Sequence, residues 1–250
     1  MPRARKKNTP DINGMSAKQM KRRKPINSDM LVEIEPLTPA QEKVFEHWDS
    51  DKNLFMSGAA GTGKTFVALY LALREVLKED SPYDKVYVVR SLVATREIGF
   101  LPGTHEDKAS LYQIPYKNMV KYMFEMPDDP SFEMLYENLK TQETVSFWST
   151  SFLRGTTLDR AIVIVDECQN LNFHELDSII TRVGEDSKII FCGDHCQSDL
   201  VKAGERNGVI DFMSILRLMD EFGMVEFGIE DIVRSGLIRS YLINKINLGF

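Results

Sequence analysis

The chain has 250 residues, 43% of them hydrophobic, which is enough for one large globular α/β domain or two small ones. No apolar run approaches the roughly eighteen residues of a membrane span, and the basic N-terminus lacks the apolar stretch of a secretory signal. The net charge is -6, and three cysteines suit a reducing compartment without disulfides. We therefore expect a cytoplasmic protein with no membrane partner.

The charge is unevenly distributed along the chain. Residues 1–30 carry nine Lys and Arg against two Asp, a net charge near +7. Such a polar, proline-containing stretch buries too little to fold alone, so we expect residues 1–31 to form a disordered arm. The arm could bind nucleic acid by neutralising phosphates, or serve as a solubilising or partner-docking tail.

The first expected helix runs from Pro39 to about Trp48. Thr38 is suited to the N-cap and Pro39 to the first helical position. Many helicase-like ATPases place a glutamine in the position of Gln41, ahead of the phosphate loop, where its amide reads the adenine edge. The alternative is a glutamine on the helix surface.

A phosphate-binding loop follows. It matches G-x-x-x-x-G-K-[ST] at every fixed position, and its residues are Gly58, Ala59, Ala60, Gly61, Thr62, Gly63, Lys64 and Thr65. An expected strand over 53–57 precedes it and an expected helix over 64–78 follows, which is the context that the motif requires. Backbone amides and the helix dipole would bind phosphate; Lys64 would reach the β- and γ-phosphates, and the Thr65 hydroxyl would bind Mg²⁺. The context disfavours the alternative, a glycine-rich turn with an incidental lysine.

The rest of the chain alternates strands and helices. Strands are expected at 85–89, 145–148, 161–165, 188–192 and 224–227, and helices at 104–140, 172–182, 210–221 and from 236 to about 245. This alternation predicts a parallel sheet covered by helices on both faces, in a single α/β domain over residues 32–250. Aromatic residues interleaved through 104–140 could stack bases, but their helical spacing favours the core.

Asp166 and Glu167 end the continuous apolar run 161–165, as a Walker B pair does. Asp166 would hold Mg²⁺ through water, and Glu167 would polarise the water that attacks the γ-phosphate. After the next strand, Gln197 stands in Gly193-Asp-x-x-Gln-x-Asp199 and could contact the γ-phosphate. This motif resembles the third motif of superfamily 1 helicases.

Cys192 and Cys196 bracket His195, which suggests zinc. A structural zinc site needs four ligands, and no second Cys/His cluster appears in the sequence. Buried thiols are the favoured interpretation.

In this order the motifs resemble those of PhoH-like ATPases, most of all the compact phage-encoded type, over residues 35–240. The matching segments are 58–65, 99–103, 152–156, 166–170, 193–199 and 231–235. The resemblance implies a P-loop NTPase with a RecA-like sheet, similar to the first such domain of superfamily 1 helicases. It also implies that Arg234 is an arginine finger and that Arg154 is a second basic residue near the nucleotide. Cys168 and Ser235 depart from the usual alanine and histidine.

These features predict a Mg²⁺-dependent ATPase coupled to RNA or single-stranded DNA binding or unwinding. Because superfamily 1 motors close two RecA-like domains on ATP and this chain has room for one, we expect a homo-oligomer, such as a hexameric ring. The rival hypothesis is an ATP-gated regulatory or assembly module with slow hydrolysis. A small-molecule kinase is a third possibility, against which the Asp166-Glu167 pair and the lack of an acceptor-binding lid argue. No cluster of metal-binding carboxylates precedes the ATPase motifs, so we expect no ribonuclease activity.

Overall fold

The computed structural model of the chain describes residues 26–91, 105–153, 155–194 and 208–248. Its six strands are β1 (Asn53–Gly58), β2 (Lys85–Arg90), β3 (Val145–Ser149), β4 (Ala161–Asp166), β5 (Lys188–Gly193) and β6 (Phe222–Phe227). They form one sheet in the order β3-β2-β4-β5-β1-β6, and every neighbouring pair is parallel. The predicted parallel α/β sheet is therefore confirmed.

The helices lie before, between and after these strands. They are η1 (Ser28–Met30), α2 (Pro39–Asp49), α3 (Lys64–Val76), α4 (His105–Phe124), α5 (Asp129–Thr141), η2 (Thr150–Leu153), η3 (Cys168–Asn170), α6 (Phe173–Ile180), α7 (Gly208–Leu216) and α8 (Gly236–Asn247). The expected helical segment 104–140 is two helices, because Asp128 begins a new one as an N-cap. The expected helix 210–221 starts earlier and ends at Leu216.

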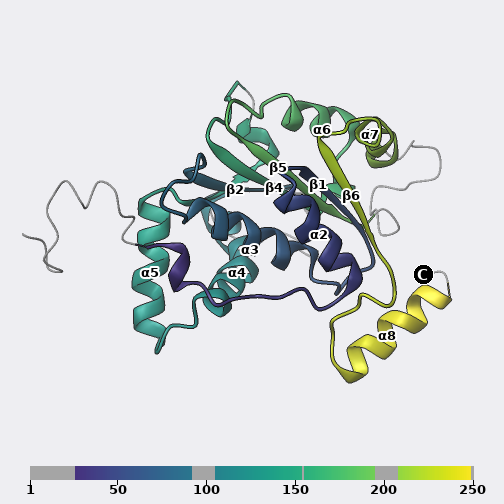
Figure 1. Ribbon diagram of the computed structural model, residues 1–250, viewed down its shortest axis with the longest axis horizontal. Helices are drawn as coiled ribbons and strands as arrows, with labels where there is room; N and C mark the ends of the chain where they lie inside the picture. Colours follow the sequence, from purple (N-terminus) through teal and green to yellow (C-terminus); the bar gives the residue numbers. More distant parts are fainter. Residues whose placement is uncertain (1–25, 92–104, 154, 195–207, 249–250) are drawn as a thin grey trace, which may run out of the picture.

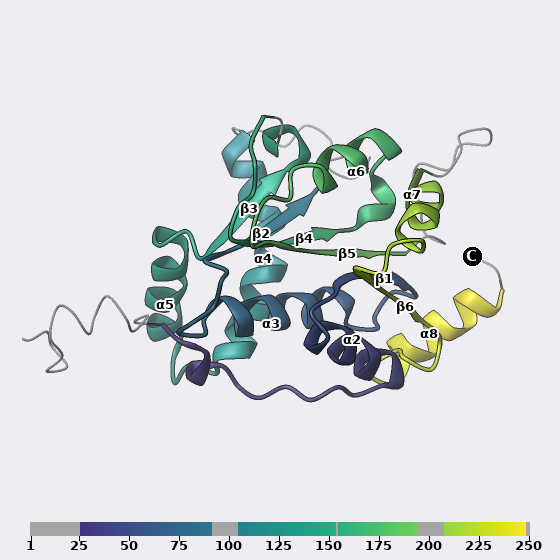
Figure 2. The same cartoon turned by 45° about the horizontal axis from the view of Figure 1, so that its top comes forward.

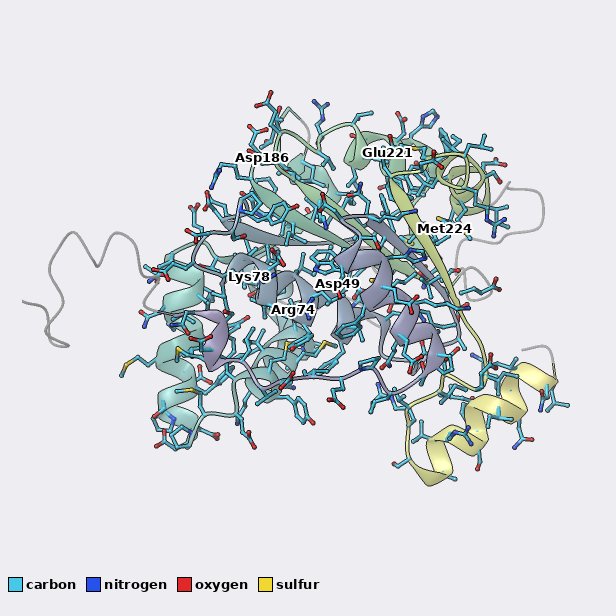
Figure 3. All side chains as sticks on the ribbon, viewed as in Figure 1. Asp49, Arg74, Lys78, Asp186, Glu221 and Met224 are labelled. Atoms are coloured by element: carbon cyan, nitrogen blue, oxygen red, sulfur yellow. The ribbon has the colours of Figure 1, made fainter. Side chains whose placement is uncertain are left out.

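Two hydrophobic clusters lie on opposite faces of the sheet. Helices α2 to α5 cover one face, and α6 and α7 cover the other, as Figure 2 shows with the sheet seen nearly edge-on. β4 is buried along its whole length, as expected of a central strand covered on both faces. On the first face, Arg74 of α3 pairs with Asp49 of α2 at 3.3 Å (Figure 3).

The position of β1 in the sheet places the phosphate loop. Leu54 pairs with Ile190 of β5 on one side and with Gly223 of β6 on the other. The strand therefore lies between two strands that come much later in the chain, and the loop that follows β1 opens at the carboxyl edge of the sheet. Ligands bind at this edge in open parallel sheets.

The two ends of the described chain differ in their packing. Ile26 is 7% exposed and the backbone amide of Ser28 donates to the carbonyl of Leu77, so packing begins earlier than the expected Val32. α8 has no buried residue and lies apart from the sheet (yellow in Figure 1). Within the described residues, no helix combines the length and apolarity needed to cross a membrane.

Candidate functional site

The phosphate loop joins the carboxyl end of β1 to the first turn of α3. Gly58 has a φ of 119°, and a Cβ there would lie 2.1 Å from the carbonyl oxygen of Phe227. Gly63, the N-cap of α3, has a φ of 85° and supplies no side-chain cap. Both positions therefore require glycine. The uncapped helix start directs the positive end of its dipole at the loop, an arrangement that binds phosphate.

Lys64 lies folded over the loop. Its Nζ donates to the carbonyl oxygens of Gly58 and Ala59, both at 2.7 Å, and to Thr62 Oγ1 at 3.3 Å. Burial lowers the pKa of Lys64, and the carboxylate of Asp194 is the largest opposing influence. The ammonium group is thus held at the loop by carbonyl acceptors, for which phosphate oxygens can substitute.

The predicted magnesium ligands lie together. Thr65 Oγ1 donates to Asp166 Oδ1 at 2.8 Å, so the first turn of α3 and the end of β4 meet. Tyr116 of α4 donates its hydroxyl to Asp166 Oδ2 at 2.5 Å. A hydroxyl and a carboxylate beside a phosphate loop are ligands that suit Mg²⁺, which prefers oxygen and retains several waters. When bound, the ion would neutralise charge on the phosphates.

A cation at the end of β2 completes this part of the site. Arg90 stands in register with Asp166. Burial lowers the pKa of Arg90, but Tyr116, Asp166 and Glu167 together outweigh this and leave the pKa raised. In the sequence, Arg90 comes directly after the expected strand 85–89, and nothing further singles it out. The part that Tyr116 plays was missed, since its helical spacing indicated nothing beyond the core.

Glu167 follows β4 in the left-handed conformation, with φ 52° and ψ 43°. Its Oε2 accepts from Gln169 Nε2 at 2.6 Å, and Gln169 Oε1 in turn accepts from the backbone amide of Asp194 at 3.0 Å. The left-handed region is unfavourable for a residue with a Cβ, and backbone strain of this kind clusters at functional sites. The sequence motif did not reveal the bridging amide of Gln169.

Gln41 is 4% exposed and contacts the phosphate loop, so it is not on the surface. Its Nε2 donates to the Thr62 carbonyl at 3.0 Å, and its Oε1 accepts from the Leu37 amide at 2.8 Å. These bonds fix the orientation of the side-chain amide. They use one of the two N–H donors and one of the two lone pairs of the amide.

The C-terminal segment closes over the loop. The Val233 amide donates to the Gly61 carbonyl at 3.0 Å, and a Cβ on Gly61 would lie 2.9 Å from Arg234 Cγ and 3.1 Å from Leu242 Cδ1. Upstream, the buried carboxylate of Asp231 accepts from two backbone amides, one on α2 and one at residue 228. This segment therefore brings Arg234 beside the phosphate loop of its own chain.

Several predicted features lie outside the described residues. They are Arg154, Gln197, the segment 99–103, His195, Cys196 and the basic arm up to residue 25. Among the described thiols, Cys168 and Cys192 are free and buried, as expected, and burial raises the pKa of both.

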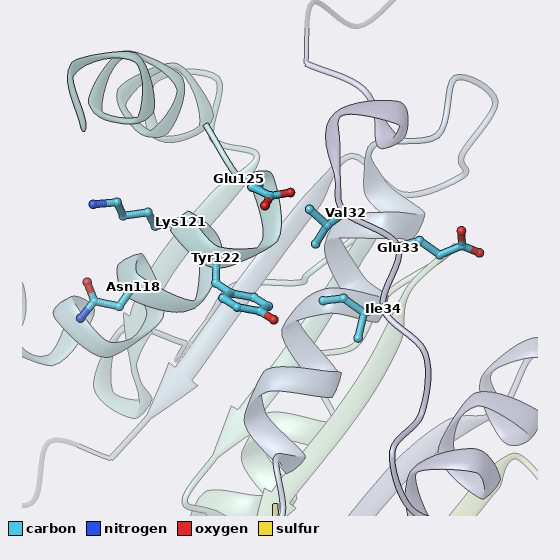
Figure 4. A pocket seen from close by; sticks show the side chains of 7 residues that line it. All are labelled: Val32, Glu33, Ile34, Asn118, Lys121, Tyr122 and Glu125. Carbon is cyan, nitrogen blue, oxygen red and sulfur yellow. The ribbon is translucent and has the colours of Figure 1, made fainter. Parts of the chain in front are cut away.

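The aromatic residues of α4 and α5 mostly belong to the core, as favoured from their spacing. Tyr116, Phe124, Phe132 and Tyr136 are at most 4% exposed, whereas Tyr122 is 68% exposed, so the core interpretation is wrong for Tyr122. Tyr122 borders a pocket of about 520 Å³ that is also lined by Val32, Glu33, Ile34, Asn118, Lys121 and Glu125 (Figure 4). Among the predicted site residues that the structure describes, none lines this pocket.

Residues 33–244 match the family model described as PhoH-like protein. A PhoH-like protein of Mycobacterium leprae is 30% identical over 206 residues, which cover 82% of this chain and 56% of the relative. The protein PhoH of Escherichia coli is 32% identical over 196 residues, covering 78% and 53% respectively. The chain spans about half the length of these curated relatives.

Solved structures similar to this chain include Bacteroides Pif1 bound to single-stranded DNA. It has a TM-score of 0.41 and 19% identity, and the match covers 86% of this chain and 46% of that one. The large terminase of a thermophilic bacteriophage, solved with ADP, has a TM-score of 0.45 and 12% identity, with coverage of 84% and 50%.

Proposed function

The chain belongs to the family of PhoH-like proteins, and on this premise we propose that it binds ATP with Mg²⁺ and hydrolyses it. The observation that carries the proposal is the 2.8 Å bond from Thr65 to Asp166, formed where the phosphate loop opens into α3. It joins the predicted metal ligands at the point where loop amides and the helix dipole favour phosphate.

The side chains at this edge have complementary tasks. Lys64 exchanges its carbonyl acceptors for the β- and γ-phosphates, and Thr65 and Asp166 hold the ion. Glu167 accepts a proton from the attacking water, since a carboxylate next to the metal ligand is suited to that task. Gln41 reads adenine with its remaining donor and acceptor, and Gln197 contacts the γ-phosphate.

The decisive experiment compares hydrolysis and binding in Glu167→Gln and Lys64→Met. We expect Glu167→Gln to lower the turnover rate by about 10²- to 10⁴-fold, the usual contribution of a general base, with little change in nucleotide affinity. Lys64→Met should lose affinity. Lys78→Met, just beyond the end of the same helix and paired with Glu75, is the matched control and should change neither. Full turnover in Glu167→Gln would remove Glu167 from the mechanism.

We further propose that hydrolysis is coupled to RNA or single-stranded DNA. The basic arm supports this, because phosphate neutralisation favours binding at low salt. The test is the steady-state rate against each polymer, with a chain lacking residues 1–25 beside the full chain; Ile26 and the residues after it are retained because they pack on the body. Strong stimulation that weakens on truncation supports coupling. A flat, slow rate favours the ATP-gated module instead.

An oligomer is the final part of the proposal. The exposed apolar side chains of α8 support it, with Leu237 83%, Ile238 51% and Tyr241 63% exposed. Arg234 lies against Gly61 of its own chain, which supports an arginine finger that acts in cis. Light scattering measures the assembly. Mixing Lys64→Met with Arg234→Ala tests the finger: recovered activity would require Arg234 to act on a neighbouring subunit.

A further inference from the structure

Gln169 joins the ends of two adjacent strands. It is 4% exposed, and it follows β4 in the short helix η3. Its Nε2 donates to Glu167 Oε2 at 2.6 Å, and its Oε1 accepts from the backbone amide of Asp194, where β5 has just ended, at 3.0 Å. Both ends of one buried amide are therefore bonded, one to the carboxylate and one to the neighbouring strand end.

Gly193, the last residue of β5, leaves space for the side chain of Gln169. A Cβ on Gly193 would lie 2.8 Å from Gln169 Oε1 and 2.5 Å from Cys168 Sγ. Only a residue without a side chain lets β5 come so close to η3. The bond to Asp194 thus depends on the last residue of β5.

The bond to Glu167 acts on a residue with a restricted backbone. Because Glu167 occupies the left-handed region, its side chain leaves the strand in a fixed direction. Rotation about the side-chain bonds is the freedom that remains, and a short, charge-assisted hydrogen bond removes much of it. The bond takes up Oε2, which leaves Oε1 to accept a proton from water.

We propose that Gln169 is a positioning residue that holds the Glu167 carboxylate in its working orientation and ties it to the end of β5. The inference rests on the proposed ATPase function, in which Glu167 is the base. Since the acceptor end of the amide is bonded to the Asp194 backbone, a displacement of that strand end reorients the base. Through its bond to the Glu167 carboxylate, Gln169 acts on the reaction indirectly.

Two substitutions separate the bonds. Gln169→Glu keeps an acceptor for the Asp194 amide but removes the donor to Glu167 and sets two carboxylates face to face. Gln169→Met keeps similar volume and removes both bonds. Gln142→Glu, an exposed amide-to-acid change at the end of α5, is the control. Each is measured for single-turnover hydrolysis, for affinity toward a fluorescent ATP analogue and for thermal unfolding, alone and combined with Glu167→Gln.

We expect both Gln169 variants to lower the hydrolysis rate by about 10- to 100-fold, the usual effect of losing a group that orients an active-site ligand. Affinity should stay within about threefold, and Gln142→Glu should match the parent chain. In a chain that already carries Glu167→Gln, the Gln169 substitutions should cause no further loss of hydrolysis rate, because the carboxylate that Gln169 orients is already absent.

The proposal fails if the Gln169 variants hydrolyse ATP at the parent rate, if their losses add to that of Glu167→Gln, or if affinity falls as much as turnover. It also fails if neither variant folds, since the amide would then be a structural requirement. Full turnover in Glu167→Gln alone would instead overturn the proposed role of the base, so the two failures are distinguishable.

Discussion

Replacing Tyr116 by phenylalanine removes one hydroxyl from the core of the site. The ring is retained, with its centroid 5.3 Å from that of Phe147, and the side chain is 2% exposed. What is lost is the hydrogen bond to Asp166 Oδ2, together with the interaction between the hydroxyl and Arg90. A buried carboxylate oxygen then loses a donor that water cannot easily replace.

The size of the effect follows from the charge of the acceptor. A hydrogen bond to an ionised group contributes about 1.5–3 kcal/mol to stability. For a domain of this size, each kcal/mol shifts the unfolding temperature by about 2–4 °C. We therefore expect Tyr116→Phe to lower the midpoint by roughly 3–12 °C in the absence of nucleotide.

Tyr136 provides the matched control. It is 3% exposed, and its hydroxyl is buried without a hydrogen-bond partner in the described part of the chain. Burial raises its pKa to about 12. Removing an unsatisfied buried hydroxyl should be neutral or stabilise by up to about 1 kcal/mol. The same chemical change is thus expected to destabilise the protein at Tyr116 but not at Tyr136, which thermal and urea unfolding can measure.

The reasoning is refuted if Tyr116→Phe and Tyr136→Phe change the stability of the protein in the same way. Equal losses at Tyr116 and Tyr136 would mean that ring packing, not the bond to Asp166, determines the effect. A Tyr116→Phe variant as stable as the parent chain would mean that the hydroxyl is dispensable to the carboxylate.

Other consequences can be measured in the same way. Gly193→Ala should destabilise by about 1–3 kcal/mol through overpacking, because the new Cβ would lie 2.5 Å from Cys168 Sγ; an unchanged urea midpoint would contradict this. Asp231→Ala leaves two backbone amides without their acceptor, so the unfolding free energy should fall by about 1.5–3 kcal/mol, and an unaltered thermal midpoint would count against it. Burial raises the pKa of the Cys168 and Cys192 thiols. In a Cys196→Ser variant neither should react with a thiol reagent at neutral pH until the chain unfolds, and rapid labelling of the native protein would disprove their burial.

Features set by neighbouring residues were predictable from the sequence. Thr38 caps α2 and Pro39 opens it, as the helix-start pattern indicates. The glycines of the phosphate loop and the strand and helix around it also follow from a contiguous motif. Such patterns are local, since a cap or a turn depends on a few consecutive dihedral angles.

Side-chain contacts that depend on how strands and helices pack together could not be predicted from local sequence patterns. Gln169 reaches the Asp194 backbone because β5 lies beside β4, and Tyr116 reaches Asp166 because α4 packs near the end of that strand. Helical spacing indicated that Tyr116 is buried, but it cannot say which side chain receives the hydroxyl. Likewise, Tyr122 shares the spacing of its neighbours but is exposed beside the pocket.

The central place of β1 has a consequence for how the protein is made. Leu54 pairs with Ile190 and Gly223, so the strand that is synthesised first among the six obtains its partners only after β5 and β6 have been made. Pairings this distant in sequence close large loops and slow folding. On the ribosome the phosphate loop therefore emerges early but acquires its supporting strands late. A chain that stops before β6 would leave one edge of β1 unpaired. Such an edge can pair with other chains and lead to aggregation.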